Sequence, residues 1–300
     1  MTESSEFSGK VAVITGGSRG IGKAVAAALV ARGAHVVIGD VLDEEGEATA
    51  EELNKQSGSK VASFLRTDVT TYKDLVALFE LAEKEFGGVD IAFLNAGISG
   101  VGSDPFSPLD DEMDELIVNV NLMGVIKGTK VAIRHMAKRG GGTIVNTASF
   151  YGFCTTDSVS SYAATKHAVI GYTRSFKTLP QVCNVRVNAV CPYYCDTDII
   201  GMTKEIPEDQ LPPMGTLVKK LPRVTLQTVV AAVLRLIQDK SLNAQALLAL
   251  PGDAIQAVGL PLELDVEKAP EVIQAYKDYE RTIVPYHRTQ LQDALHAHKL

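Results

Sequence analysis

Residues 11–22 read Val-Ala-Val-Ile-Thr-Gly-Gly-Ser-Arg-Gly-Ile-Gly. The stretch begins as an apolar run and passes into glycines, and residues 20–32 then repeat alanine, valine and leucine at helical spacing. This pattern predicts a strand, a tight turn and a helix. Because glycine lets the backbone approach a ligand closely and a helix start offers free N–H groups, the turn favours a bound pyrophosphate. A glycine-bearing turn without a ligand is the plainer alternative, and the turn's place between strand and helix argues against it.

The rest of the chain continues the alternation of strand and helix. The strands are near-continuous apolar runs, which indicates burial on both faces and hence a parallel sheet covered by helices. We therefore predict an α/β fold: one doubly wound domain over residues 1–300, with its core at 8–252 and seven parallel strands. The expected strands are residues 11–15, 35–40, 60–66, 89–95, 142–148, 185–190 and 246–250. The expected helices are residues 20–32, 44–55, 74–86, 113–138, 160–179 and 228–238.

Two segments depart from this alternation. Residues 197–225 form a long irregular stretch that contains several prolines and large apolar side chains. A loop of this length inside a compact domain is usually a lid or binding loop, so we predict a substrate lid, with a surface insertion packing on its own core as the alternative. Residues 262–300 are charged and carry helical spacing, and we expect a helical extension there.

The composition argues against several classes of partner. The net charge is −7 without a long basic run, so neither nucleic acid nor an anionic membrane is expected. The apolar stretches fall short of the ~20 residues that a membrane span needs, and the acidic N-terminus lacks the features of a signal peptide. We therefore expect a cytoplasmic protein. Its four cysteines and six histidines lack metal-ligand spacing, so we expect reduced thiols and no metal site.

A carboxylate ends the second expected strand. Asp40 can accept hydrogen bonds from an adenosine ribose and would repel a 2′-phosphate, which favours NAD over NADP. Arg19, in the glycine turn, argues the other way because it can pair with that phosphate. We weigh Asp40 more heavily, because a partly buried carboxylate that faces a phosphate dianion costs more than a mobile arginine recovers. As an alternative, Asp40 would cap the helix that follows it.

Further polar residues follow the other expected strands. Asp68-Val69, Asn95-Ala96-Gly97 and Ser149 each come directly after a strand. Ligands of open parallel sheets bind at this carboxyl edge. We therefore expect these groups to lie around one site.

Tyr162 and Lys166 lie four residues apart in Ser-Ser-Tyr-Ala-Ala-Thr-Lys-His. Residues at this spacing share one face of a helix, where an ammonium favours the phenolate, so that the tyrosine can exchange a proton near neutral pH. Lowering a phenol pKa from about 10 to about 7 requires roughly 4 kcal/mol, and one ammonium at an effective dielectric of ~20 supplies energy of that order. Without Ser149 and the glycine turn, a solvated helix face would be the better interpretation.

Several short motifs follow one another within residues 8–252. They are Thr15-Gly-x-x-x-Gly20-Ile-Gly22, Asp68-Val69, Asn95-Ala-Gly97, Val120-Asn121-Leu122, Ser149, Tyr162-x-x-x-Lys166 and Asn188-x-x-x-Pro192. In these motifs, their order and their spacing, the chain resembles the short-chain dehydrogenase/reductase family. The resemblance implies a Rossmann fold that binds a nicotinamide dinucleotide. Within the family, residues 161–175 are similar to the NAD-linked 15-hydroxyprostaglandin dehydrogenase group.

The resemblance implies a role for each of four residues. Tyr162 is the general acid/base, and Ser149 holds the substrate oxygen. Lys166 binds the nicotinamide ribose and lowers the pKa of Tyr162. Asn121 supports the lysine through a water, and the Val-Asn-Leu pattern selects it over Asn119. The residues implied to bind the cofactor are Gly16, Ser18, Arg19, Gly20, Ile21, Gly22, Asp40, Asp68, Val69, Asn95, Ala96, Gly97, Lys130, Tyr162, Lys166, Pro192, Cys195 and Thr197.

The chain departs from the family pattern after the sixth expected strand. Where the family commonly has Pro-Gly, this chain has Pro192-Tyr193-Tyr194. A tyrosine in place of glycine must avoid a positive φ or be strained. We expect a homodimer or a homotetramer. The tail at 262–300 is also extra, and in relatives the equivalent region packs between subunits, so the tail is a place where the oligomerisation of this chain would differ. The aromatic residues expected near the site are Phe150, Tyr151, Phe153, Tyr193 and Tyr194.

We therefore expect an NAD(H)-dependent oxidoreductase that interconverts a secondary alcohol and a ketone on a moderately large, apolar substrate. An NADP(H)-dependent ketoreductase of a biosynthetic pathway is the alternative within this class. A nucleotide-binding scaffold without redox activity, or a catalyst of a rearrangement, is the alternative of another class. The complete set of Asn121, Ser149, Tyr162 and Lys166 argues against it.

Overall fold

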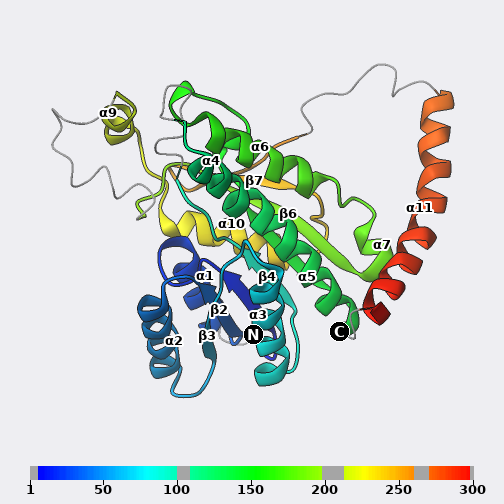
Figure 1. The fold of residues 1–300 in the computed structure, drawn as a ribbon, viewed down its shortest axis with the longest axis horizontal. Coiled ribbons are helices and arrows are strands. Elements are labelled where there is room, and N and C mark those ends of the chain that lie inside the picture. The colour runs from blue at the N-terminus through cyan, green and yellow to red at the C-terminus, as the bar shows by residue number, and fades with distance from the viewer. Residues whose placement is uncertain (1–5, 100–108, 198–212, 260–269, 298–300) are drawn as a thin grey trace.

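The protein is built around one β-sheet, and the computed structural model describes residues 6–99, 109–197, 213–259 and 270–297. The strands are β1 Val11–Thr15, β2 His35–Asp40, β3 Ala62–Arg66, β4 Ile91–Leu94, β5 Gly142–Thr147, β6 Val185–Pro192, β7 Ala246–Leu250 and β8 Ala254–Ala257. They lie in the order β3-β2-β1-β4-β5-β6-β7-β8 (Figure 1). The chain works outward from β1 in both directions, which confirms the predicted doubly wound α/β fold.

Helices cover both faces of the sheet. One face carries α1 (Gly20–Val30), α2 (Asp43–Ser57) and α10 (Leu226–Gln238). The other carries α3 (Tyr72–Phe86), α5 (Gly124–Arg139) and α6 (Ser160–Arg174). The remaining helices are α4 Asp111–Val118, α7 Leu179–Cys183, α9 Pro213–Lys220 and α11 Pro270–Ala297, with short turns η2 Asn119–Met123, η3 Phe150–Gly152 and η4 Asp157–Val159.

β1 shows why its sequence is apolar throughout. Val11 and Val13 join the apolar cluster under α3 and α5, whereas Ala12 and Ile14 join the cluster under α1 and α10. Successive side chains of a strand point to opposite faces of the sheet. A strand that is covered on both sides is therefore a continuous apolar run, as the sequence predicted.

The sheet has one strand more than the seven predicted. β8 pairs antiparallel with β7 after a turn in which Gly252 and Asp253 have φ of 75° and 59°. The strand lies at the sheet edge, and three of its four residues are exposed. Its sequence, Ala-Ile-Gln-Ala, has no continuous apolar run. The pattern that identifies strands buried on both faces therefore does not detect it.

A long helical run crosses the second face of the sheet as α4, η2 and α5. By its length and by the mean hydropathy of 1.4 of an 18-residue window within it, the helical run of residues 111–139 is the one described helix that would be able to cross a membrane. Val131, Ala132 and Met136 of this run are buried in the cluster that α3 and the sheet also form. A core helix of this kind passes the same test, so packing in the core explains its apolar composition.

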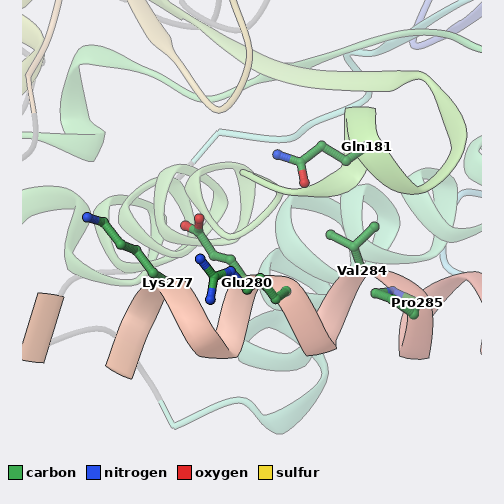
Figure 2. Close-up of a pocket in the computed structure, with 6 residues that line it drawn as sticks. Gln181, Lys277, Glu280, Val284 and Pro285 are labelled. Carbon is green, nitrogen blue, oxygen red and sulfur yellow. The ribbon is translucent and has the colours of Figure 1, made fainter. Parts of the chain in front are cut away.

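The helix α11 fills most of the expected C-terminal extension and lies beside α7 at the periphery of the molecule (Figure 1). Val284 is its one described side chain that is buried, and Arg288 donates a hydrogen bond to the carbonyl of Gln181 at 2.5 Å. Figure 2 shows the hollow between the two helices, where Gln181 lies opposite Val284 and Glu280. None of the predicted site residues lines this hollow.

Arg186 of β6 holds the end of α10 against the sheet. Its guanidinium donates to the carbonyls of Leu236 at 3.1 Å, Ile237 at 2.7 Å and Leu242 at 2.5 Å. The carbonyls of Leu236 and Ile237 lie in the last turn of α10, where a cation also interacts well with the helix dipole, and that of Leu242 follows the helix.

We expect Arg186→Met to lower the free energy of unfolding by about 2–4 kcal/mol, because several buried carbonyls lose a charged donor at once. Urea denaturation measures the loss. Arg235→Met, on the exposed face of α10, is the control and should change the stability by less than about 0.5 kcal/mol. Equal losses in the two variants would contradict this account of Arg186.

Candidate active site

Polar side chains join the carboxyl ends of β1, β4 and β5. The hydroxyl of Thr15 accepts hydrogen bonds from the backbone N–H groups of Asn95 at 3.0 Å and Ala96 at 3.2 Å. Asn95 donates its side-chain amide to the carbonyl of Gly16 at 2.9 Å and accepts from the hydroxyl of Thr147 at 3.2 Å. Asn95 thus fixes the glycine turn relative to its neighbours. Sequence reasoning quoted Thr15 within the glycine motif without giving it a role, and it missed Thr147; the signal of both is a polar residue that ends a buried strand.

The glycine turn is packed too tightly for side chains. Gly16 and Gly20 have φ of 65° and 57°, which favours glycine. A Cβ on Gly16 would lie 2.7 Å from the Cα of Ala96, and one on Gly22 would lie 2.8 Å from the Cα of Gly17 and closer still to the carbonyl oxygen of Gly16. The turn therefore brings bare backbone to the start of α1.

The start of α1 fits an anionic group. No side chain caps this helix, and its first turn carries no acidic residue. The dipole and the N–H groups of the first turn attract a phosphate under these conditions. Thr197 lies beside the turn, because a Cβ on Gly20 would be 3.4 Å from its methyl group. The residues present therefore fit the pyrophosphate of a dinucleotide.

Asp40 lies next to the same turn at the end of β2. Its carboxylate accepts hydrogen bonds from the backbone N–H of Ser18 at 3.1 Å and of Leu42 at 3.3 Å. The nearby Arg19 is half-exposed, and its guanidinium lies 3.8 Å from the carboxylate of Glu45 in α2. The carboxylate of Asp40 is thus fixed beside the glycine turn by two hydrogen bonds, while the guanidinium of Arg19 lies near the carboxylate of Glu45.

Tyr162 and Lys166 lie on one face of α6, as their spacing predicted. The ammonium of Lys166 is 5.4 Å from the centre of the Tyr162 ring and donates to the carbonyl of Thr147 at 3.1 Å. Ser149 follows β5 and is buried. Its hydroxyl accepts from the backbone N–H of Tyr151 at 3.2 Å, and its closeness to Tyr162 works to lower the pKa of that phenol. The structure therefore places a serine, a tyrosine and a lysine together.

Asn121 is fully buried in the π-helical turn η2, between α4 and α5. Its side chain exchanges two hydrogen bonds with the backbone of Ile98, at 2.8 and 3.0 Å. A Cβ on Gly97 would lie 3.2 Å from the Asn121 oxygen and 3.6 Å from the Lys166 nitrogen, so the segment after β4 runs close to both groups. Single π turns inside α-helices are frequent at functional sites.

Burial governs the charges of the pair. It raises the pKa of Tyr162 to about 12, and the hydrogen bond with Ser149 opposes the rise. Burial also lowers the pKa of Lys166 to about 8, so the ammonium is mostly protonated at pH 7. The sequence predicted a tyrosine that exchanges protons near neutral pH; in the protein alone, the loss of hydration outweighs the effect of Ser149 and holds the pKa of Tyr162 above its ordinary value.

An aromatic cluster lies beside Tyr162. The rings of Phe150 and Tyr193 are 4.5 Å apart, and the hydroxyls of Tyr151 and Tyr194 are 2.5 Å apart. The φ angle of Tyr193 is not positive, so the tyrosine at this position is unstrained. The predicted lid at 197–225 has residues 198–212 outside the described part of the chain. Its helix α9 packs Val218 and Met214 on the cluster.

Some predicted residues lie apart from this group. Lys130 is exposed on α5, nine residues or roughly 13 Å along the helix from Asn121, and the structure does not bring it to the site. Phe153 packs under Arg174, 5.6 Å away, rather than with the aromatic cluster. Asp68 accepts from the N–H of Thr70 at 2.8 Å, and Val69 packs against Gly124.

The end of β6 approaches the site from the other side. Pro192 is the last residue of β6. Cys195 is buried, and its backbone pairs with that of Val224 in an isolated parallel β-bridge. Thr197 then reaches the glycine turn. The predicted residues after β6 thus lie where the turn and the aromatic cluster meet.

Comparisons with known proteins agree with this arrangement. Residues 10–210 match a family model described as short chain dehydrogenase. A cis-4-hydroxycyclohexanecarboxylate dehydrogenase of Sinomonas cyclohexanicum is 40% identical over 195 residues, 65% of this chain and 77% of that protein. A 3-alpha-(or 20-beta)-hydroxysteroid dehydrogenase of Mycobacterium tuberculosis is 38% identical over 201 residues, 67% of this chain and 74% of that protein.

Solved structures share the fold. Levodione reductase superposes with a TM-score of 0.73 at 28% identity, covering 81% of this chain and 96% of the other. A variant of actinorhodin polyketide ketoreductase with NADPH superposes with a TM-score of 0.70 at 29% identity, with the same coverage of 81% and 96%.

Proposed function

Since the chain belongs to the short-chain dehydrogenase family and is an oxidoreductase that acts on a CH–OH group, we propose that it uses NAD(H) to interconvert a secondary alcohol and a ketone on a moderately large, apolar, ring-shaped substrate. The observation that carries this proposal is the group of buried Ser149, partly buried Tyr162 and buried Lys166, together with the uncapped start of α1.

The proposed chemistry divides among these residues. When bound, a nicotinamide cofactor would supply the hydride acceptor or donor for the carbinol carbon. Tyr162 takes the hydroxyl proton of the alcohol during oxidation and returns it during reduction, and Ser149 donates a hydrogen bond to the same oxygen. Lys166 supplies positive charge behind the phenol, 5.4 Å from its ring. Asn121 holds the segment after β4 next to the lysine.

The residues proposed to hold the cofactor surround this group. The glycine turn and Thr197 would bind the pyrophosphate, Asp40 the adenosine ribose, and the Asn95–Gly97 segment and Lys166 the nicotinamide half. Cys195 and Pro192 would border the nicotinamide. Lys130 is left out of this proposal because it lies nine residues along the helix from Asn121.

The substrate class rests on the walls of the site. Phe150, Tyr193 and Val218 are apolar surfaces close to Tyr162, and relatives are named for alicyclic alcohols: cyclohexanol, a hydroxycyclohexanecarboxylate and hydroxysteroids. The packing of α9 on this wall supports a lid. A homodimer or homotetramer in the cytoplasm, and the narrower likeness to 15-hydroxyprostaglandin dehydrogenases, stay predictions.

A cofactor-reduction assay tests the proposed function. The enzyme is incubated with NAD and a panel of secondary alcohols: cyclohexanol, 4-hydroxycyclohexanecarboxylate and a 3-hydroxysteroid. The corresponding ketones are offered with NADH. Oxidation of an alicyclic alcohol that exceeds that of 2-propanol by at least tenfold in kcat/KM is the expected result. The absence of turnover on the whole panel, despite NAD binding measured by calorimetry, would overturn the redox proposal in favour of a nucleotide-binding scaffold.

We expect Asp40→Ala to shift the cofactor preference toward NADP. A carboxylate about 5 Å from a phosphate charge, at an effective dielectric of ~20, repels it by roughly 3 kcal/mol, which corresponds to a factor of about 100. The ratio of kcat/KM for NAD to that for NADP should therefore fall about 100-fold. Asp43→Ala, an exposed carboxylate three residues on that pairs with Arg66, is the control and should leave the ratio unchanged. If Asp40→Ala also leaves it unchanged, the basis for proposing NAD is wrong.

A further inference from the structure

Tyr151 lies in the short turn η3, between the serine and the helix that carries the tyrosine and the lysine. This turn is pressed against α6: a Cβ on Gly152 would lie 2.9 Å from the carbonyl oxygen of Lys166 and closer still to the side chain of Ile170. Because no side chain separates the backbone of Gly152 from that of Lys166, a shift of η3 would also displace the backbone of Lys166. Tyr151 is thus built into the contact between the two parts of the active site.

Tyr151 touches both groups that are proposed to handle the substrate oxygen. Its backbone N–H donates to the hydroxyl oxygen of Ser149 at 3.2 Å. This bond uses a lone pair of the serine, which leaves the single hydroxyl proton to point toward Tyr162 or a substrate oxygen. Its ring also lies edge-on to the ring of Tyr162, with centres 6.2 Å apart and planes at 88°, a favoured arrangement of aromatic rings.

The far end of Tyr151 is tied to a different strand end. Its hydroxyl lies 2.5 Å from the hydroxyl of Tyr194, which follows β6. Tyr194 is fixed in turn: its carbonyl accepts from the N–H of Val224 at 2.9 Å, and the guanidinium of Arg223 lies over its ring at 5.9 Å. The hydroxyl pair therefore joins the end of β5 to the end of β6, beyond the last backbone bonds between these strands.

Both members of the pair are buried and neutral. Burial raises the pKa of Tyr151 and of Tyr194, so each keeps its proton at physiological pH. Residue exposures of 8% and 9% show that the pair faces protein rather than solvent. A neutral hydrogen bond at this place fixes geometry without adding a charge that would compete with Lys166.

Building on the proposed function, we propose that Tyr151 is a positioning residue: held at its hydroxyl by Tyr194, it keeps the Ser149 hydroxyl and the Tyr162 ring aligned for proton transfer. Tyr194 acts only through Tyr151, and the two form one unit.

The test compares Tyr151→Phe, Tyr194→Phe and the double variant, with Tyr172→Phe as a control. Tyr172 lies on α6 as well, and its hydroxyl donates to the carbonyl of Ile126 at 3.4 Å, away from the site. Each single variant should lower kcat about tenfold, since small misplacements of reacting groups cost up to about 100-fold. The double variant should be no slower than either single one, because residues that act as a unit are non-additive.

A pH profile separates positioning from a general loss of structure. A hydrogen bond from Ser149 to the phenolate lowers the pKa of Tyr162, so loosening it should move the acidic limb of the kcat profile for alcohol oxidation up by at least about 0.5 pH unit. Affinity for NAD by calorimetry and the melting temperature should remain near those of the parent enzyme. The alcohol used is the one that the parent oxidises fastest in the panel above.

The outcomes are distinguishable. If the effects of Tyr151→Phe and Tyr194→Phe multiply in the double variant, or if the acidic limb stays in place, the positioning role is wrong although the proposed function stands. If the variants raise KM for an alcohol with a second oxygen and leave kcat unchanged, the pair binds substrate and the proposal is likewise overturned. If the parent enzyme oxidises none of the alcohols in the panel, or if Tyr162→Phe oxidises them as fast as the parent enzyme does, the proposed function itself is wrong.

Discussion

Tyr162→Phe is expected to lower kcat about 1,000-fold for both alcohol oxidation and ketone reduction. The phenylalanine keeps the ring, its edge-on contact with Tyr151 and the place of Lys166 over its face, but it has no proton to exchange. A positioned acid or base contributes about 10²–10⁴ in rate. Steady-state kinetics with NAD and NADH on the best alcohol and ketone of the panel measure the loss.

Binding separates this loss from damage to the fold. The affinity for NAD, measured by calorimetry, should change by less than about threefold, because the glycine turn and Asp40 are untouched. Tyr172→Phe removes a phenol hydroxyl from the same helix, and we expect it to retain activity close to that of the parent enzyme. A Tyr162→Phe enzyme with more than about a tenth of the parental kcat would show that another group moves the proton.

The fold followed from the sequence because its strands are buried on both faces. The side chains of residues 11–14 pack alternately into the two apolar clusters on either side of the sheet, so the apolar run in the sequence directly indicates burial on both faces. The strand β8 was not predicted, because it is an exposed edge strand without a continuous apolar run, and its pairing depends on a turn with two residues at positive φ.

The site was predictable where local spacing fixes geometry, and less so where distant packing does. Because Tyr162 and Lys166 are four positions apart on one helix, the ammonium of Lys166 lies over the ring of Tyr162. Lys130 was implied by resemblance alone, and the rise of α5 carries it away from Asn121. The bond between Tyr151 and Tyr194 joins residues 43 apart in the chain, and no local pattern indicates such a contact. The raised pKa of Tyr162 likewise reflects burial by several elements.

Gly22→Ala is expected to weaken the binding of NAD at least about 30-fold and to lower the free energy of unfolding by roughly 1–3 kcal/mol. The added methyl would meet the carbonyl oxygen of Gly16 and the Cα of Gly17, the latter at 2.8 Å. These are backbone atoms of the turn, which cannot move aside as a flexible side chain can. The turn must therefore open, and the N–H groups at the start of α1 lose the geometry that would hold a pyrophosphate.

Gly171→Ala provides the matched control for this substitution. Gly171 lies in α6, and a Cβ there would meet no atom within 4 Å. The same change should stabilise the protein by about 0.5–1 kcal/mol, since alanine is the better helix former, and NAD affinity should be unchanged. Calorimetric titration with NAD and urea denaturation of both variants measure the contrast. If Gly22→Ala binds NAD within about threefold of the parent enzyme, the nucleotide does not rest on this turn, and the place proposed for the pyrophosphate is wrong.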